Sequence, residues 1–470
     1  MKLSKFLIAG LIFFLSSNVY AEDVEVKSES KDRVSLSVTI YNENLALVKD
    51  KRNLNLDKGI NNIAFTEVSG EIKPETSIVK GSGISVLEQN FNFDLLTPEK
   101  ILQKAVGSKV KLINVNPATG EQTIEDAELL SAVGRPVLRI GDRIETNYPG
   151  RIVFDSVPKN LRDKPTLTLM INSENAGQNE MELGYLTRGL GWKADYVAEL
   201  NDSDDSLDLN GWVTLTNSSG VDYEKASLQL VAGDVNVVRE HFMAPRMAKA
   251  VMMEADNSFG GGMQEEGFSD FHLYSLGRPT TIASNQTKQV SLLSASNVKT
   301  NREYKMESPF GIYNGNSGDF ENINANIYQK FFNKEDNNLG MPLPKGTIRV
   351  YKSDSKGKMV FAGEDSVVHT PKNEEIKLKL GSAFDITASG KQTEYKRISN
   401  HSFENSYELT IKNAKDQDVV VNVHQRISGD WRILAESIKN EQVNSGEVLW
   451  SVPVKASGET KLTFTLFVNN

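Results

Sequence analysis

Residues 184–236 read GYLTRGLGWKADYVAELNDSDDSLDLNGWVTLTNSSGVDYEKASLQLVAGDVN. Apolar and polar side chains alternate over 212–216 and again over 226–230, and an Asn-Ser-Ser-Gly run at 217–220 separates the two segments. Strict alternation is typical of a half-buried strand, and such a run is typical of a turn. A bend at 189–191 needs the φ freedom of glycine. The stretch therefore predicts the core of a β-sheet.

The alternation continues on both sides of this stretch. It begins at Val34 and becomes longest after Gln392, where three runs have an apolar residue at every second position. We expect a mainly β protein of several antiparallel β-sandwich domains, with a small β-barrel-like N-terminal part and few short helices. The three runs are Tyr407, Leu409 and Ile411; Val419, Val421 and Val423; and Leu462, Phe464 and Leu466.

One helix is expected early in the chain, over residues 98–106. Thr97 precedes Pro98 and Gly107 follows the segment, which matches the residue preferences of helix ends. Five short strands should follow in a small barrel, because apolar runs and turn residues alternate within about 45 residues. The strands are expected at 109–115, 127–130, 137–140, 144–146 and 151–154.

The first 21 residues have the pattern of a secretory signal peptide. Lys2 and Lys5 precede an apolar run over 6–15 that is too short to span a bilayer, and small residues end at Ala21. We predict cleavage after Ala21, export to the periplasm or the exterior, and no transmembrane segment in the mature chain.

Composition narrows the classes of function. Cleavage would leave 51 basic and 62 acidic side chains, a net charge of −11, which disfavours binding to the phosphate backbone of a nucleic acid. The chain has no cysteine, so it can form neither a disulfide nor a thiolate metal site. We expect no cofactor, a protein partner in the cell envelope and no nucleic-acid partner.

Three domains are expected after the signal peptide (1–21). They are an N-terminal β domain (33–165) that contains the helix and the small barrel, a central β domain (166–385) and a C-terminal β-sandwich (386–470). Residues 239–267 interrupt the central domain as a long insertion with five methionines and a Gly260-Gly261-Gly262 run. Residues 311–336 are Asn-rich with loosely spaced apolar residues, and a strand at 375–380 should end at 381–385.

Three segments resemble a family of bacterial proteins that carry domain of unknown function 4139. They are residues 39–76 with 87–96, the central stretch with Trp192, Asn217 and residues 220–234, and residues 339–386, LGMPLPKGTIRVYKSDSKGKMVFAGEDSVVHTPKNEEIKLKLGSAFDI. The resemblance implies an exported, β-rich protein and supplies no catalytic residues.

Motifs of hydrolases and nucleotide-binding proteins are absent from the sequence. It contains no G-x-S-x-G, no H-E-x-x-H and no G-x-x-x-x-G-K-[ST]. The best local constellation is His369 with Glu364 and Asp365, because a carboxylate can orient an imidazole as a general base. A histidine that ends a strand before the turn at Pro371 explains the same residues more simply.

Two further groups have residue types that bind metals. His241, Met243, Met247 and Met252 could bind Cu(I) through soft sulfur ligands, although methionines in a Gly-rich loop more often form an adaptable contact surface. That surface would centre on Met252, Met253 and Phe259. The acidic residues of 202–208 could ligate calcium, although a solvated hairpin tip explains them more simply.

The hypothesis favoured by these observations is a non-catalytic binding or scaffolding module of the cell envelope, with residues 239–267 as its contact element. The alternatives are an envelope hydrolase whose site is assembled from distant residues, with His369 and Glu364 as members, and copper binding by the methionine-rich loop.

Overall fold

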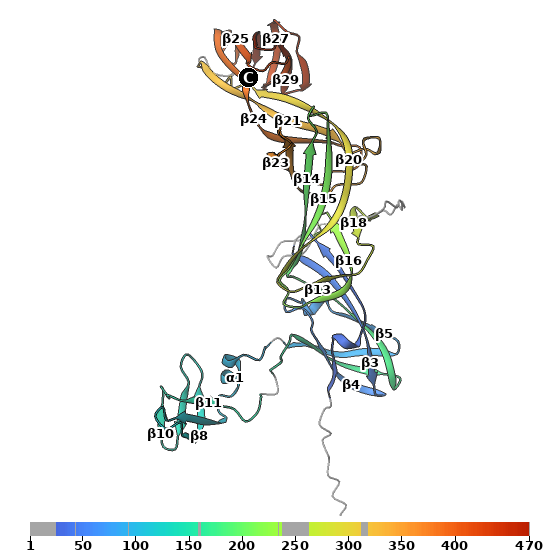
Figure 1. The fold of residues 1–470 in the computed structure, drawn as a ribbon, viewed down its shortest axis with the longest axis vertical. Coiled ribbons are helices and arrows are strands. Elements are labelled where there is room, and N and C mark those ends of the chain that lie inside the picture. Colours follow the sequence, from blue (N-terminus) through green and yellow to red (C-terminus); the bar gives the residue numbers. More distant parts are fainter. Residues whose placement is uncertain are drawn as a thin grey trace, which may run out of the picture. The chain divides into compact units, whose positions relative to one another are not determined.

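The computed structural model describes residues 25–42, 44–92, 94–157, 161–233, 235–236, 263–311 and 318–469 (Figure 1). Thirty strands account for most of these residues, and the described helices are one α-helix and three short 3-10 helices. The prediction of a mainly β fold is confirmed. The chain divides into two compact units, one of residues 1–36 and 48–187 and the other of residues 37–47 and 188–470. Residues 166–187 lie in the first of these units, and the expected boundaries of the three domains remain a prediction.

The first unit contains a four-stranded sheet in the order β1-β4-β12-β6. Its strands are β1 (Glu25–Ser28), β4 (Gly59–Thr66), β12 (Thr166–Ser173) and β6 (Ile84–Asn92). β1 is parallel to β4, and β12 is antiparallel to both β4 and β6. The unit also includes β13 (Gly177–Thr187), which pairs with β5 (Ile78–Gly81), the 3-10 helices Ser30–Asp32 and Pro74–Thr76, and residues 48–56 of β3 (Leu45–Leu56).

A buried arginine holds the N-terminal strand of this unit. The guanidinium of Arg52 is fully buried and donates to a carboxylate oxygen of Asp50 at 2.7 Å, to the carbonyl of Ser28 at 2.9 Å and to the carbonyl of Thr66 at 3.0 Å. Its face lies 4.1 Å from the centre of the Phe65 ring. A buried charge is tolerated only when it is paired and hydrogen-bonded. The network therefore couples β1 to β3 and β4.

The small sheet expected after the helix lies within the first unit. Helix α1 (Pro98–Lys104) begins at the Thr97 cap, whose hydroxyl accepts from the Lys100 N–H, and Ala105 contributes to the core of the sheet. The antiparallel order is β10-β9-β8-β7-β11, close to the predicted strands. The strands are β7 (Lys109–Val115), β8 (Gln122–Ser131), β9 (Val137–Ile140), β10 (Arg143–Glu145) and β11 (Arg151–Val153).

The two ends of this segment meet. The Leu96 N–H donates to the Arg162 carbonyl at 2.8 Å, and the Arg162 N–H donates to the Asp94 carbonyl at 3.1 Å. The core of the sheet is also separate, since it is formed by Ala105, Val110, Leu112, Ala127, Leu129 and Leu138. Residues 97–157 are therefore an insertion with its own core, entered and left at neighbouring points of the chain.

The second unit begins with a sandwich built around the stretch 184–236. One layer contains β23 (Met359–Val367), β22 (Gly346–Ser353), β14 (Leu190–Leu200), β15 (Ser206–Asn217) and β20 (Gln286–Glu307), in that order. The other layer contains β17 (Gln264–Phe268), β18 (Phe271–Ser275), β16 (Tyr223–Ala232) and residues 37–41 of β2 (Arg33–Tyr41), with β19 (Thr280–Ile282) on β16. Gly189 has a φ of 82°, so the predicted bend before Trp192 is confirmed.

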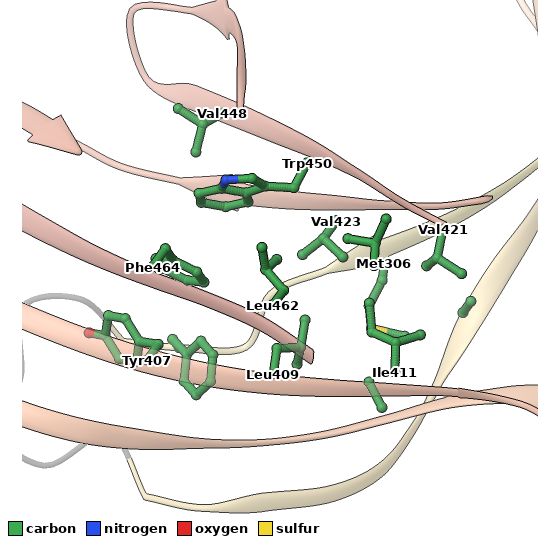
Figure 2. Close-up of a cluster of buried hydrophobic side chains, with 14 of the residues drawn as sticks. Met306, Tyr407, Leu409, Ile411, Val421, Val423, Val448, Trp450, Leu462 and Phe464 are labelled. Atoms are coloured by element: carbon green, nitrogen blue, oxygen red, sulfur yellow. The ribbon is translucent and has the colours of Figure 1, made fainter. Parts of the chain in front are cut away.

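A second sandwich follows in the same unit. One layer has the order β21-β24-β25-β30-β27, and the other contains the end of β20 with β26, β29 and β28. Between them, Trp450 stacks on Phe464 at 4.4 Å between ring centres, beside Leu462, Leu409 and Tyr407 (Figure 2). The strands are β21 (Phe320–Phe332), β24 (Glu375–Arg397), β25 (Ser402–Asn413), β26 (Val419–Arg426), β27 (Asp430–Glu436), β28 (Glu441–Asn444), β29 (Glu447–Val454) and β30 (Gly458–Asn469).

The two sandwiches repeat one structural unit. Asn217 ends β15 as Asn413 ends β25, and both are buried. Each side-chain amide donates to the carbonyl four residues on (2.9 and 2.8 Å), and each amide oxygen accepts from the N–H two residues on (3.0 Å in both). Each amide also reaches the carbonyl of the residue that ends β19 or β29, Ile282 or Val454.

The strand pairings repeat in the same way. Asn217 lies opposite Gln286 of β20 as Asn413 lies opposite Gly458 of β30. The Asp222 carboxylate accepts the Ser284 N–H at 2.6 Å, in the turn after β19. In the same way, the Asp418 carboxylate accepts the Ala456 N–H at 2.9 Å, in the turn after β29. β16 lies parallel to β2 as β26 lies parallel to the end of β20. The second unit is therefore a tandem of two related sandwiches.

The structure differs from one sequence prediction in this unit and adds a strand where none was assigned. The strand expected to stop at 381–385 continues through Gly381, whose φ of 148° lies at a register shift between β24 and β21. The Asn-rich segment 311–336 contains β21, which pairs with both β20 and β24, and the 3-10 helix Glu335–Asn337.

Candidate functional site

An open cleft of about 480 Å³ lies at one side of the C-terminal sandwich. Its walls come from β27 on one side and from β28 with the following turn on the other. Both are edge strands of their layers. Among the described strands, β27 pairs with β30 alone and β28 pairs with β29 alone. We call this the β27–β28 cleft. It is lined by Gly429, Asp430, Trp431, Arg432, Ile433, Asn440, Gln442 and Ser445.

The β27 wall is the edge of the strand. Five consecutive residues, 429–433, line the cleft. Successive side chains of a strand point to opposite faces, so one face cannot present five consecutive residues. The wall therefore includes the main chain of β27 on the side away from β30, where no other strand of the described part of the chain pairs with its N–H and C=O groups.

The side chains of β27 distinguish an inner face from an outer face. Trp431 and Ile433 are half-buried and pack against the sandwich core, whereas Asp430 and Arg432 are exposed. The Arg432 guanidinium lies 4.6 Å from the centre of the Phe467 ring and has no carboxylate partner among the described residues. The cleft is thus apolar toward the core and charged toward solvent.

Polar contacts hold the two walls in place. The Trp431 indole N–H donates to the Ser445 carbonyl at 2.8 Å and ties β27 to the turn after β28. The Glu436 carboxylate accepts from the Asn440 amide at 3.0 Å and from the Trp450 indole N–H at 2.9 Å. Because these bonds join both layers, the cleft is a preformed feature of the sandwich.

His369 lies elsewhere in the second unit. Its Nδ1 accepts the Lys345 N–H at 3.2 Å, so a neutral ring carries its proton on Nε2. Nε2 is 3.4 Å from the Asn42 amide, whose oxygen is otherwise buried without a partner among the described atoms. The amide orientation that points this oxygen at Nε2–H satisfies both groups. His369 thereby ties residue 42 to residue 345.

Glu364 has a different partner from His369. Its carboxylate lies 3.2 Å from Nε of Arg349, on the neighbouring strand β22, and Arg349 also bonds Asp195 at 3.1 Å. Asp365 accepts the Lys379 N–H at 2.8 Å. The hydrogen bonds of His369 with residues 42 and 345 involve neither Glu364 nor Asp365. A catalytic role for the pair remains a prediction.

Two other histidines pair with carboxylates. His424 Nδ1 lies 2.6 Å from Glu447, and this hydrogen bond lowers the pKa of the Glu447 carboxyl group. His272 Nδ1 lies 2.7 Å from Glu265 on the adjacent strand β17. Within the described ranges, no three His, Asp or Glu side chains gather closely enough to hold a metal ion.

The acidic hairpin tip at 202–208 is tied by hydrogen bonds and ion pairs. Asp204 pairs with Lys352 at 2.8 Å and with Arg302 at 2.9 Å, while Asp208 accepts the Asn297 N–H at 2.8 Å. The remaining expected binding residues lie outside the described residues. They are His241, Met243, Met247, Met252, Met253 and Phe259.

Sequence reasoning did not identify the β27–β28 cleft. The signal was present in residues 430–433, where a tryptophan and an isoleucine alternate with an aspartate and an arginine, followed by the mostly polar residues 440–445. Such a pattern predicts a strand but not that the strand lies at an edge, because pairing depends on residues far away in the chain.

Comparison with protein families identifies the chain. The family model for the domain of unknown function DUF4139 matches residues 181–469, which is more than half of the chain. The protein is therefore a member of the DUF4139 family. The matched region includes the second and third segments on which the resemblance was based, and the first lies outside it. No curated protein matched the chain, and no helix among the described residues is long and apolar enough to cross a membrane.

Proposed function

We propose that this DUF4139 protein is a non-catalytic binding module of the cell envelope that holds a partner protein in the β27–β28 cleft. The observation that carries the proposal is the cleft itself, which is lined by the edge strand β27 and by side chains of residues 440–445. Export rests on the signal-peptide pattern of residues 1–21.

The charge distribution supports a protein partner. The cleft offers one exposed acid, Asp430, one exposed base, Arg432, and the amide side chains of Asn440 and Gln442. Interfaces between proteins combine an aromatic anchor with arginine and a polar rim, as Trp431 and its neighbours do here. The segment 239–267 with Met252, Met253 and Phe259 remains a second proposed contact element.

Site-specific photo-crosslinking in cells tests the proposal. A photoreactive residue at Gln442, which is exposed and lines the cleft, should yield a discrete protein adduct. The matched control is a probe at Glu459, which is exposed and lies in the part of β30 that does not pair with β27. Equal adducts from both positions, or none from Gln442 in folded protein, would contradict a binding role for the cleft.

A further inference from the structure

The β27–β28 cleft has the features of a site for main-chain recognition. β27 carries ladder hydrogen bonds to β30 on one side, while its other side faces the cleft. In a strand, the N–H and C=O groups of consecutive residues point alternately to the two sides. About half of the backbone groups of 429–433 therefore point into the cleft.

Unpaired strand edges are a liability that proteins usually reduce with a proline, an inward-pointing charge or a covering segment. β27 has the sequence DWRILAE, without proline, and its inward positions 431 and 433 are apolar. Asp430 and Arg432 lie on the outer face, whereas the terminal Glu436 points to the core side and accepts from the Trp450 indole N–H. The pairing of β27 with β30 shifts register between Ile433 and Ala435, so the regular edge that a further strand can join is that of residues 430–433.

We propose that the β27–β28 cleft binds an extended segment of a partner protein, which adds to the sheet as a strand beside β27. This inference rests on the proposed function and specifies its mode of recognition. Strand addition obtains affinity from main-chain hydrogen bonds and specificity from alternate side chains.

The faces of β27 specify the sequence of the segment. An added strand keeps its inward side chains level with those of its neighbour. Residues beside Trp431 and Ile433 must therefore be apolar, and residues beside Asp430 and Arg432 must be polar with the complementary charges. The bound segment alternates apolar residues with basic or acidic ones.

A displayed library of random twelve-residue peptides tests the proposal, with the purified full-length protein as the target. We expect enriched peptides to alternate in the way described above. Substitution Arg432→Glu should change the enriched outward residue opposite position 432 from acidic to basic. Arg432 is exposed and stacks on Phe467 without a carboxylate partner among the described residues, so this variant should fold.

Proline variants provide the control for main-chain recognition. Of Arg432→Pro and Ile433→Pro, one removes an N–H that faces β30 and the other an N–H that faces the cleft. Because Ile433 also packs against the core, each proline variant is compared with the alanine variant at the same position. The proline variant that keeps the thermal midpoint of its alanine counterpart is the one that alters the free edge. It should lose about tenfold in affinity for an enriched peptide, the effect of one or two lost main-chain hydrogen bonds with the added steric conflict.

Outcomes separate the two proposals. Three results would overturn strand addition. They are enriched peptides without alternation, no enrichment over a blank surface, and equal binding of an enriched peptide to Arg432→Glu and to the parent. A Gln442 adduct obtained together with any of these results would leave the cleft as a protein-binding site of another kind. An enriched peptide that competes with the Gln442 adduct would support both proposals.

Discussion

At the scale of single residues, stability in the first unit depends on one buried ionic network. Arg52 contacts groups of β1, β3 and β4, and Asp50 accepts from both Arg33 and Arg52. Burial raises the pKa of the Asp50 carboxyl group, but the hydrogen bonds from Arg33 and Arg52 outweigh burial, so its net pKa is lowered from 3.8.

Removing Arg52 should therefore be costly. Arg52→Met leaves the buried Asp50 carboxylate with fewer partners, and breaking such a pair costs about 3–5 kcal/mol of unfolding free energy. Chemical denaturation of both proteins at pH 7 measures the loss. The matched control is Lys51→Met, because Lys51 is the adjacent residue and its exposed ion pair with Glu180 contributes little. Equal losses in the two variants would contradict a special role for Arg52.

The same network predicts a dependence on acid. Because the pKa of Asp50 is lower in the folded state, its ionised carboxylate contributes fully to the free energy of unfolding above about pH 4. This contribution is lost as the pH falls through the folded-state pKa of Asp50. Asp50→Asn should be less stable than the parent at pH 7 and should lose less further stability between pH 4 and pH 2. Urea unfolding across this range compares the slopes, and parallel slopes would argue against the lowered pKa.

At the scale of elements, the sequence shows which residues alternate and not how long each strand runs. The alternation at 407–411, 419–423 and 462–466 located β25, β26 and β30 correctly. Turn residues misled the prediction at Gly381, because a glycine of φ 148° can also bend a strand that continues. The edge position of β27 follows from its pairing with β30, which no local pattern encodes.

The repeated turn predicts equal behaviour of two distant asparagines. Asn217→Ala and Asn413→Ala each remove a buried amide, which leaves two carbonyl oxygens without that donor at Asn217 and three at Asn413. Each should lower the free energy of unfolding by about 2–3 kcal/mol. Asn301→Ala, at an exposed position of β20, is the control and should change it by less than about 0.5 kcal/mol. Costs that differ several-fold between Asn217 and Asn413 would contradict the structural repeat.

At the scale of the whole molecule, the insertion 97–157 should be separable. Its ends meet between Asp94, Leu96 and Arg162, and its core is its own. Replacing residues 97–160 by a short Gly-Ser linker should leave the rest of the chain folded, with a thermal midpoint within about 4 °C of the parent. Differential scanning calorimetry measures this change. Loss of the remaining cooperative transition would show that the insertion is required for folding.

The long strand β20 has a mechanical consequence. Its 22 residues pair with β15 in the first sandwich and with β21 and β26 in the second. A pull along the chain between the sandwiches therefore cannot separate them at a flexible hinge. It loads the ladders beside β20 in shear, where many hydrogen bonds must break together. A protein built in this way transmits tension from one sandwich to the other as a continuous ribbon.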